Sequence, residues 1–220
     1  MSPSKYPFKP DLNCDLGEGL NNEHLLMPYL TSCSIACGGH AGSVESIDKV
    51  IDLAVRHGVK IGAHPSYPDR SHFGRVVMDI PDRQLGESLE EQLRFFKKRA
   101  EKQNAPVNHV KPHGALYNLI AVYREKAELV SEVIAKVFPK TKIYAPYHSK
   151  MSEVAPRFGL KVVFEAFADR NYNDDLSLVS RTNPQAVITD ESVVLNHVKR
   201  MVESSRVRTM EGHMKEIKAE

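Results

Sequence analysis

The sequence predicts an α/β protein, a TIM-like parallel β/α barrel that forms a single domain over residues 1–220. Short apolar runs recur along the chain, and a polar cluster and then a helical pattern of apolar residues follow most of them. At 220 residues and 41% hydrophobic content, the chain can bury one full core. Polar clusters follow nearly every strand, which favours a closed barrel over a doubly wound open sheet with a single switch point.

Composition excludes several classes of partner. The net charge of +2 comes from 30 basic and 28 acidic side chains that are mixed throughout, so we expect no nucleic-acid and no membrane partner. The first ten residues lack an apolar leader core, and no later segment approaches the roughly 20 apolar residues of a membrane span. Cys14, Cys33 and Cys37 form no disulfide-like framework, and we expect a cytoplasmic protein.

The first predicted strand runs from Phe8 to Asp15. Side chains alternate between the faces of a strand, so Asp11, Asn13 and Asp15 share one face and apolar residues form the other. Glu18 follows the strand end. We expect these polar groups to converge inside the barrel.

Two further strand-to-helix units each carry a histidine after the strand. Ser34–Cys37 leads into a glycine-rich loop that contains His40, and a helix follows from the N-cap Ser43 to Gly58. Val59–Ala63 is the third strand and leads directly to His64, which begins a long polar and aromatic loop. Both histidines are therefore candidates for the barrel face that carries chemistry.

The fourth strand, Val107–His113, places a lysine and a histidine at a strand end. Pro112 cannot extend a central ladder, so Lys111 and His113 lie where the strand stops. A helix striped by Leu89, Leu93, Phe96 and Ala100 precedes it.

The remaining elements continue the alternation. We expect helices over Arg124–Phe138, Ser149–Phe158 and Asp190–Glu203, and strands over Lys142–Ala145 and Lys161–Phe167. The last of these strands carries Glu165 and runs into Asp169, Arg170 and Tyr172. Residues 206–220 show no helical pattern.

Eight titratable residues would face one pocket in such a barrel. They are Asp11, Asp15, His40, His64, Lys111, His113, Glu165 and Asp169. This mixture could bind a divalent metal, with Asp15, His40 and His64 as the candidate ligands. It could equally work without metal, with lysine and histidine as acid, base and oxyanion stabiliser. The spacing of these residues along the sequence does not distinguish a metal site from a metal-free acid–base site.

Five motifs in order resemble the LamB/YcsF family over nearly the whole chain. They are Asp11–Glu18 (DLNCDLGE), Ile35–Gly42 (IACGGHAG), Gly62–Asp69 (GAHPSYPD), Val110–Tyr117 (VKPHGALY) and Glu165–Tyr172 (EAFADRNY). Gly39 and Ser43 stand where the family is expected to carry an aromatic residue and an aspartate. The resemblance implies a seven-stranded barrel similar to that of polysaccharide deacetylases. Its last strand, with a Cys-Val-His-Gly-Asp motif, would follow Glu220, so we expect this chain to lack it.

The resemblance also implies a function. Bacterial members are the A subunit of ATP-dependent 5-oxoprolinase, a hydrolase that opens pyroglutamate to L-glutamate together with B and C subunits. ATP and Mg²⁺ would then act through the complex, and no tightly bound cofactor is evident. No G-x-x-x-x-G-K-[ST] motif occurs, so we expect the nucleotide-binding step to need the partners. The sequence leaves a homo-oligomer open.

This functional hypothesis gives roles to twelve residues. The catalytic set is Asp11, Asp15, His64, Lys111 and His113, and the substrate-binding set is Asn13, Glu18, His40, Glu165, Asp169, Arg170 and Tyr172. Lysine and arginine would neutralise negative charge, an aspartate would activate water and a histidine would relay protons. Two alternatives stay open: a metal-dependent amide or carbohydrate deacetylase, and a non-catalytic subunit that binds a carboxylate or sugar.

Overall fold

The computed structural model describes residues 10–220, which fall into two compact units. The larger unit comprises Asp11–Ala145 and Ser149–Val162, and the smaller comprises Pro146–His148 and Val163–Glu220 together with Pro10. The assignment of all 220 residues to one domain remains a prediction.

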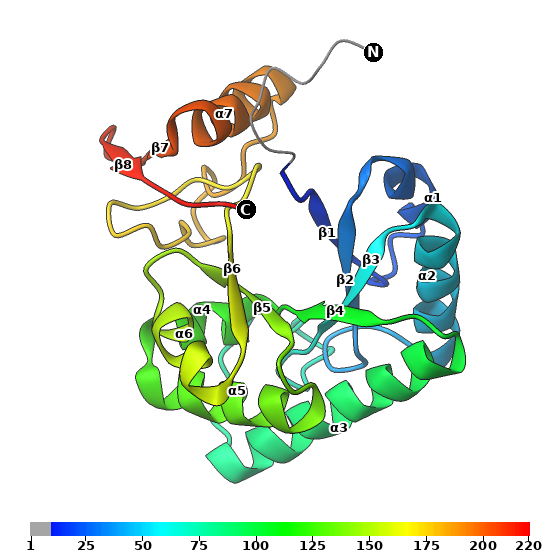
Figure 1. The fold of residues 1–220 in the computed structure, drawn as a ribbon. Helices are drawn as coiled ribbons and strands as arrows, with labels where there is room; N and C mark the ends of the chain where they lie inside the picture. The colour runs from blue at the N-terminus through cyan, green and yellow to red at the C-terminus, as the bar shows by residue number, and fades with distance from the viewer. Residues whose placement is uncertain (1–9) are drawn as a thin grey trace. The chain divides into compact units, whose positions relative to one another are not determined.

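A parallel sheet in sequence order organises the larger unit, and its last strand continues into the smaller unit at Val163. The strands are β1 (Asn13–Leu16), β2 (Ser32–Ala36), β3 (Lys60–His64), β4 (Val107–Val110), β5 (Lys142–Pro146) and β6 (Lys161–Glu165). They neighbour one another in the order β1-β2-β3-β4-β5-β6, and the pairs from β1 to β5 are parallel (Figure 1). This order is that of a TIM-like β/α fold and excludes the doubly wound alternative. The sheet has no seventh strand among residues 10–220.

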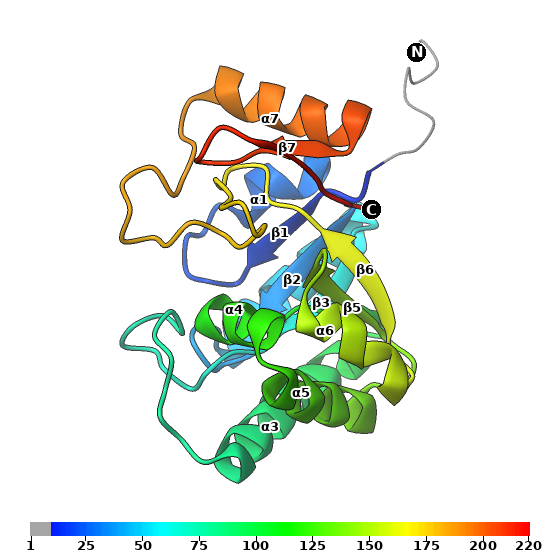
Figure 2. The ribbon, with the colours of Figure 1, turned by 90° about the vertical axis from the view of Figure 1, so that its left-hand side faces the viewer.

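Helices follow the strands as the sequence predicts, with some additions. The helices of this unit are α1 (Glu23–Leu26), α2 (Val44–His57), α3 (Asp82–Lys102), α4 (Gly114–Val122), α5 (Arg124–Val137) and α6 (Lys150–Val154), with 3₁₀ turns at Met27–Tyr29 and Ala155–Phe158. Helix α2 begins at a Ser43 capping box and ends at Gly58, whose φ of 67° is left-handed. Helices α2, α3 and α5 contact one another in turn, and Figure 2 shows α3 and α5 lying alongside each other.

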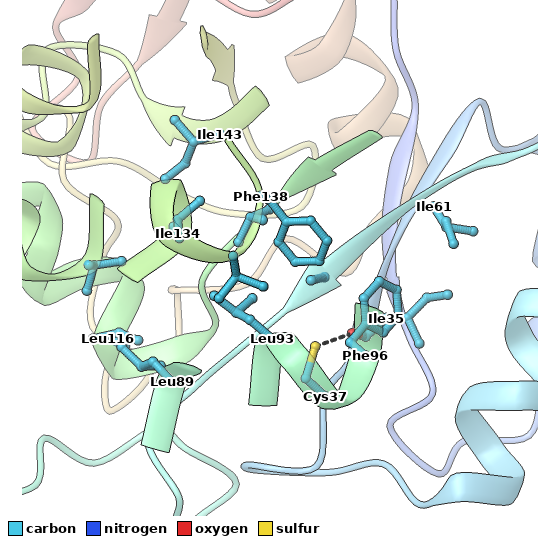
Figure 3. Close-up of a cluster of buried hydrophobic side chains, with 14 of the residues drawn as sticks. Ile35, Cys37, Ile61, Leu89, Leu93, Phe96, Leu116, Ile134, Phe138 and Ile143 are labelled. Carbon is cyan, nitrogen blue, oxygen red and sulfur yellow. Dashed lines mark hydrogen bonds between the residues drawn. The ribbon is translucent and has the colours of Figure 1, made fainter. Parts of the chain in front are cut away.

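The core lies between these helices and the sheet. Leu89, Leu93 and Phe96 of α3 are almost fully buried against strand residues such as Ile35 and Ile61 (Figure 3). Cys33 and Cys37 belong to the same core, where burial raises the pKa of the Cys33 thiol to about 12. These cysteines therefore act as small buried side chains and not as reactive thiols.

The first strand is shorter than the sequence predicts. Phe8 and Lys9 lie outside the described residues, and β1 begins only at Asn13. Leu12 N–H donates to the Thr31 hydroxyl (2.7 Å) instead of a backbone carbonyl, so regular pairing starts after it. Strand β4 also ends earlier than predicted, at Val110, although Lys111 N–H still donates to the Ala63 carbonyl (2.9 Å).

The smaller unit contains α7 (Glu191–Ser204) and an antiparallel hairpin of β7 (Arg206–Arg208) and β8 (Met214–Glu216). The Asp190 side chain caps α7 by accepting from the Ser192 and Val193 N–H groups, so the helix begins one residue after the predicted start. The sequence does not predict the hairpin, because its strands have only three residues each. Val207, Tyr172 and Ile217 form the buried centre of this unit.

Gly62 of β3 lies against the His109 side chain of β4. Gly62 pairs with His109 next to a register shift, and a side chain on Gly62 would overlap the buried His109 imidazole. The absent Gly62 side chain thus makes space for a polar ring on the interior of the sheet.

Gly62→Ala should therefore lower the free energy of unfolding by about 1–3 kcal/mol through overpacking. Gly86→Ala is the matched control, because a methyl group there would make only ordinary contact with Leu129 and would favour helix α3 by about 0.5–1 kcal/mol. Urea denaturation of both variants measures the difference. Equal effects of the two substitutions would contradict this description of the β3–β4 contact.

Candidate functional site

The candidate site lies at the carboxyl ends of β1 to β4, entirely within the larger unit. Its six residues are Asp15, Glu18, His40, His64, Lys111 and His113. Each lies at a strand end or in the loop that follows, and parallel strands bring these positions to one edge of the sheet. The structure thus brings together four of the five predicted catalytic residues and two of the predicted substrate-binding residues.

Lys111 connects the carboxyl ends of strands β1, β3 and β4 through three hydrogen bonds. Its Nζ donates to Asp15 Oδ1 (3.0 Å), its N–H donates to the Ala63 carbonyl, and its own carbonyl accepts from His64 Nδ1 (2.6 Å). The lysine side chain is only 6% exposed, whereas that of Asp15 is 28% exposed. Lys111 is therefore the shielded partner of the ion pair, and Asp15 is the partly exposed one.

Asp15 is held as a carboxylate. Burial alone would raise its pKa, but His64 and Lys111 beside it outweigh burial and keep that pKa well below its usual range. His64 Nε2 lies 3.3 Å from Asp15 Oδ2. A charged acceptor therefore faces both a lysine and an imidazole, which suits it to orient a water molecule.

The three histidines pack ring against ring around Glu18. His113 Nδ1 lies 2.9 Å from His64 Nε2, and the ring of His113 stacks on that of His40 with centroids 3.7 Å apart. His40 Nε2 lies 3.0 Å from Glu18 Oε1. Burial, reinforced by the neighbouring imidazoles His64 and His40, lowers the pKa of His113 to about 2. His113 is thus a neutral imidazole near neutral pH, with a lone pair that can accept a proton or bind a metal.

Below this cluster, Asn13 of β1 and Asp11, two residues before it, form two further polar layers. Asn13 donates to Ser32 Oγ (2.7 Å), accepts from Ser34 Oγ (3.0 Å) and lies 3.4 Å from His109 Nε2. Asp11 Oδ2 accepts from the Tyr144 hydroxyl (2.6 Å). The predicted shared face of Asp11, Asn13 and Asp15 is therefore polar at each level.

Asp11 and Asn13 form hydrogen bonds with side chains of neighbouring strands and loops, and neither bonds to the six site residues in the contacts given above. Burial raises the pKa of Asp11, but hydrogen bonds from Thr31 and Tyr144 outweigh it and lower that pKa. Sequence reasoning missed His109 and Tyr144 as members of this interior. The signal for His109 was present, because it lies two residues before Lys111 on the same predicted strand.

The remaining predicted substrate-binding residues belong to the smaller unit. Arg170 is buried and donates to the carbonyls of Ala186 (3.1 Å) and Val179 (2.6 Å), and the Tyr172 hydroxyl accepts from Phe167 N–H (2.7 Å). Glu165 is partly buried and Asp169 is exposed. The assigned substrate contacts of these four residues remain predictions.

Parallel strands that gather a lysine, two carboxylates and three histidines at one edge define a TIM-like β/α protein with an acid–base site. The sequence profile of the LamB/YcsF family matches residues 10–220. This chain belongs to that family.

Several known proteins are similar along nearly the whole chain. A protein from Neisseria meningitidis that is named as the A subunit of 5-oxoprolinase is 38% identical over 210 residues, which cover 96% of this chain and 86% of that protein. One of the same name from Histophilus somni is 40% identical over 210 residues, covering 96% and 85%. The crystal structure of a lactam utilization protein from Thermus thermophilus superposes with a TM-score of 0.90 at 32% identity, covering 96% of this chain and 88% of that one. In residues 10–220, no helix combines the length and apolar character of a membrane span.

His109 gives the fold a pH dependence. Burial, helped by the charge of Lys111, lowers the pKa of His109 to about 3, whereas an unfolded histidine titrates near about 6.5. Below that pH the unfolded chain binds a proton that the folded chain does not, so stability falls as pH falls.

The His109→Gln variant should lose this contribution. Between about pH 7 and about pH 5, its free energy of unfolding should decline by about 2 kcal/mol less than that of the unsubstituted protein. Urea denaturation at the two pH values measures this difference. An identical decline in both proteins would show that His109 does not remain neutral in the fold.

Proposed function

We propose that this chain acts as the A subunit of an ATP-dependent 5-oxoprolinase, which opens 5-oxoproline to L-glutamate with B and C subunits. The Lys111–Asp15 pair beside His64 carries the proposal, because it combines a cation, a carboxylate and a proton carrier at an accessible strand end. The relatives' names, which specify the A subunit of 5-oxoprolinase and a lactam utilization protein, support a multisubunit hydrolase of a cyclic amide. A cytoplasmic location fits the ATP requirement and the free cysteines.

Hydrolysis of a lactam makes three demands on a site. Negative charge that develops on the ring carbonyl oxygen needs a cation, the attacking water needs an acceptor, and the ring nitrogen needs a proton. In this proposal the Lys111 ammonium meets the first demand and the Asp15 carboxylate the second. His64 or His113 relays the proton, since their ring nitrogens lie 2.9 Å apart beside Asp15.

Opening a five-membered lactam to an amino acid is uphill near neutral pH, so the reaction needs coupling to ATP. ATP with Mg²⁺ would supply the phosphoryl group that makes the ring carbon electrophilic. No G-x-x-x-x-G-K-[ST] motif marks a phosphate-binding loop on this chain. We therefore assign ATP binding to the partner subunits.

This proposed role predicts a strict requirement for partners. ATP-dependent glutamate formation from 5-oxoproline should appear only when this chain, B and C are combined. The chain alone, and B with C alone, serve as controls. A complete mixture without turnover, or B and C that need no third chain, would contradict the proposed role.

Lys111→Met should reduce turnover of the complete mixture by about 100-fold or more, because the cation facing the developing charge is lost. Asp15→Asn, which keeps the side-chain shape, should do the same. Lys49→Met is the matched control, since Lys49 is an exposed residue on α2. Circular dichroism establishes that each variant is folded. Folded variants with unreduced glutamate formation would remove these two roles.

A further inference from the structure

Two histidines of the site present lone pairs to each other. A backbone carbonyl can only accept, so the contacts of His64 Nδ1 with the Lys111 carbonyl (2.6 Å) and of His113 Nε2 with the Phe73 carbonyl (3.0 Å) fix the ring protons on those nitrogens. The opposite nitrogens, His64 Nε2 and His113 Nδ1, lie 2.9 Å apart. Two lone pairs in this arrangement would repel each other, and a proton or a metal ion beside both nitrogens removes that repulsion.

Four ligand atoms converge at this position. Nitrogen atoms of His40, His64 and His113 and a carboxylate oxygen of Glu18 lie within 4.8 Å of one another. A proton would bridge only two of these atoms. A metal ion can use all four, and the number of convergent groups therefore favours a metal.

The distances match a tetrahedral metal site. Metal–ligand bonds of about 2.0–2.1 Å place the corners of a tetrahedron about 3.3–3.4 Å apart. Glu18 Oε1 lies 3.0 Å from His40 Nε2, 3.5 Å from His113 Nδ1 and 3.7 Å from His64 Nε2. Together with the 2.9 Å between His64 Nε2 and His113 Nδ1, these four separations bracket the tetrahedral value, and all six lie within 4.8 Å. The His40 ring stacks nearly parallel to that of His113, so it must turn to aim its in-plane lone pair at the ion.

The surroundings supply the features of a built site. Backbone carbonyls orient His64 and His113 through the second ring nitrogen, which is the usual support of metal-bound histidine. His40 is 2% exposed and faces Glu18 through Nε2, although its Nδ1 lacks the supporting hydrogen bond that His64 and His113 have within residues 10–220. Lys111 offsets the charge of Asp15, which leaves the Glu18 carboxylate to attract a cation.

We propose that Glu18, His40, His64 and His113 bind one divalent transition-metal ion, with Zn²⁺ as the best match to three imidazoles and one carboxylate. Asp15 lies outside the four, 3.3 Å from His64 Nε2. The set therefore shares His40 and His64 with the ligands considered from the sequence, and has Glu18 and His113 in place of Asp15. The proposal concerns metal binding and does not depend on the identity of the substrate. With the ion bound, His64 Nε2 and His113 Nδ1 are ligands, so the proton relay proposed above applies to the metal-free site.

Calorimetric titration of the untagged, chelator-treated full chain with Zn²⁺ tests the proposal directly. We expect one ion per chain, and Co²⁺ in the same site should give the intense visible absorption of a tetrahedral complex. Glu18→Gln preserves shape and should weaken Zn²⁺ binding at least tenfold. His72→Gln is the matched control, because His72 pairs with Asp69 at an exposed position outside the cluster.

Absence of stoichiometric binding by the unsubstituted chain would overturn the proposal, as would a weak octahedral Co²⁺ spectrum or equal affinity in folded Glu18→Gln. These readouts need neither substrate nor partner subunits. Their failure would leave the proposed lactam hydrolysis standing, and failure of that activity would leave the metal result interpretable.

Discussion

The arrangement of the site depends on the position of Lys111. Its N–H continues the ladder from β4 to β3, its carbonyl orients His64, and its ammonium pairs with Asp15 at the end of β1. A nearly buried lysine requires such a partner, because an unpaired charge in this environment would cost several kcal/mol. One residue thus fixes the relative positions of three strand ends, and the tautomer of His64 follows from it.

Polar side chains line the interior of the sheet near β1. Removing them from water costs free energy, and their hydrogen bonds offset that cost. Asn13 is hydrogen-bonded to Ser32 and Ser34, and Asp11 is hydrogen-bonded to Tyr144. Buried polar groups in such satisfied networks specify a single arrangement and resist repacking. Asp15 and Glu18, at the open end, are the carboxylates left for chemistry, while the deeper levels position them.

Much of this could be read from the sequence. Strand order, helix α2 with its cap, and the shared face of Asp11, Asn13 and Asp15 all follow from periodicity and turn chemistry. Helix α4 was missed because its residues are apolar on nearly all sides and show no stripe. The sequence predicts that His40 and His113 face one pocket, but not the orientation of the His113 ring, which depends on the long loop that brings the Phe73 carbonyl to it. Cross-strand partners depend on register, which the irregularity at Gly62 shifts.

The Lys111–Asp15 pair is the place proposed above for lactam chemistry. A crystal structure of the complete assembly with bound 5-oxoproline would test this claim most directly. We expect the ring carbonyl oxygen within hydrogen-bonding distance of Lys111 Nζ, with Asp15 and His64 facing the ring. A lactam bound away from these residues, with the ion pair undisturbed, would contradict the claim.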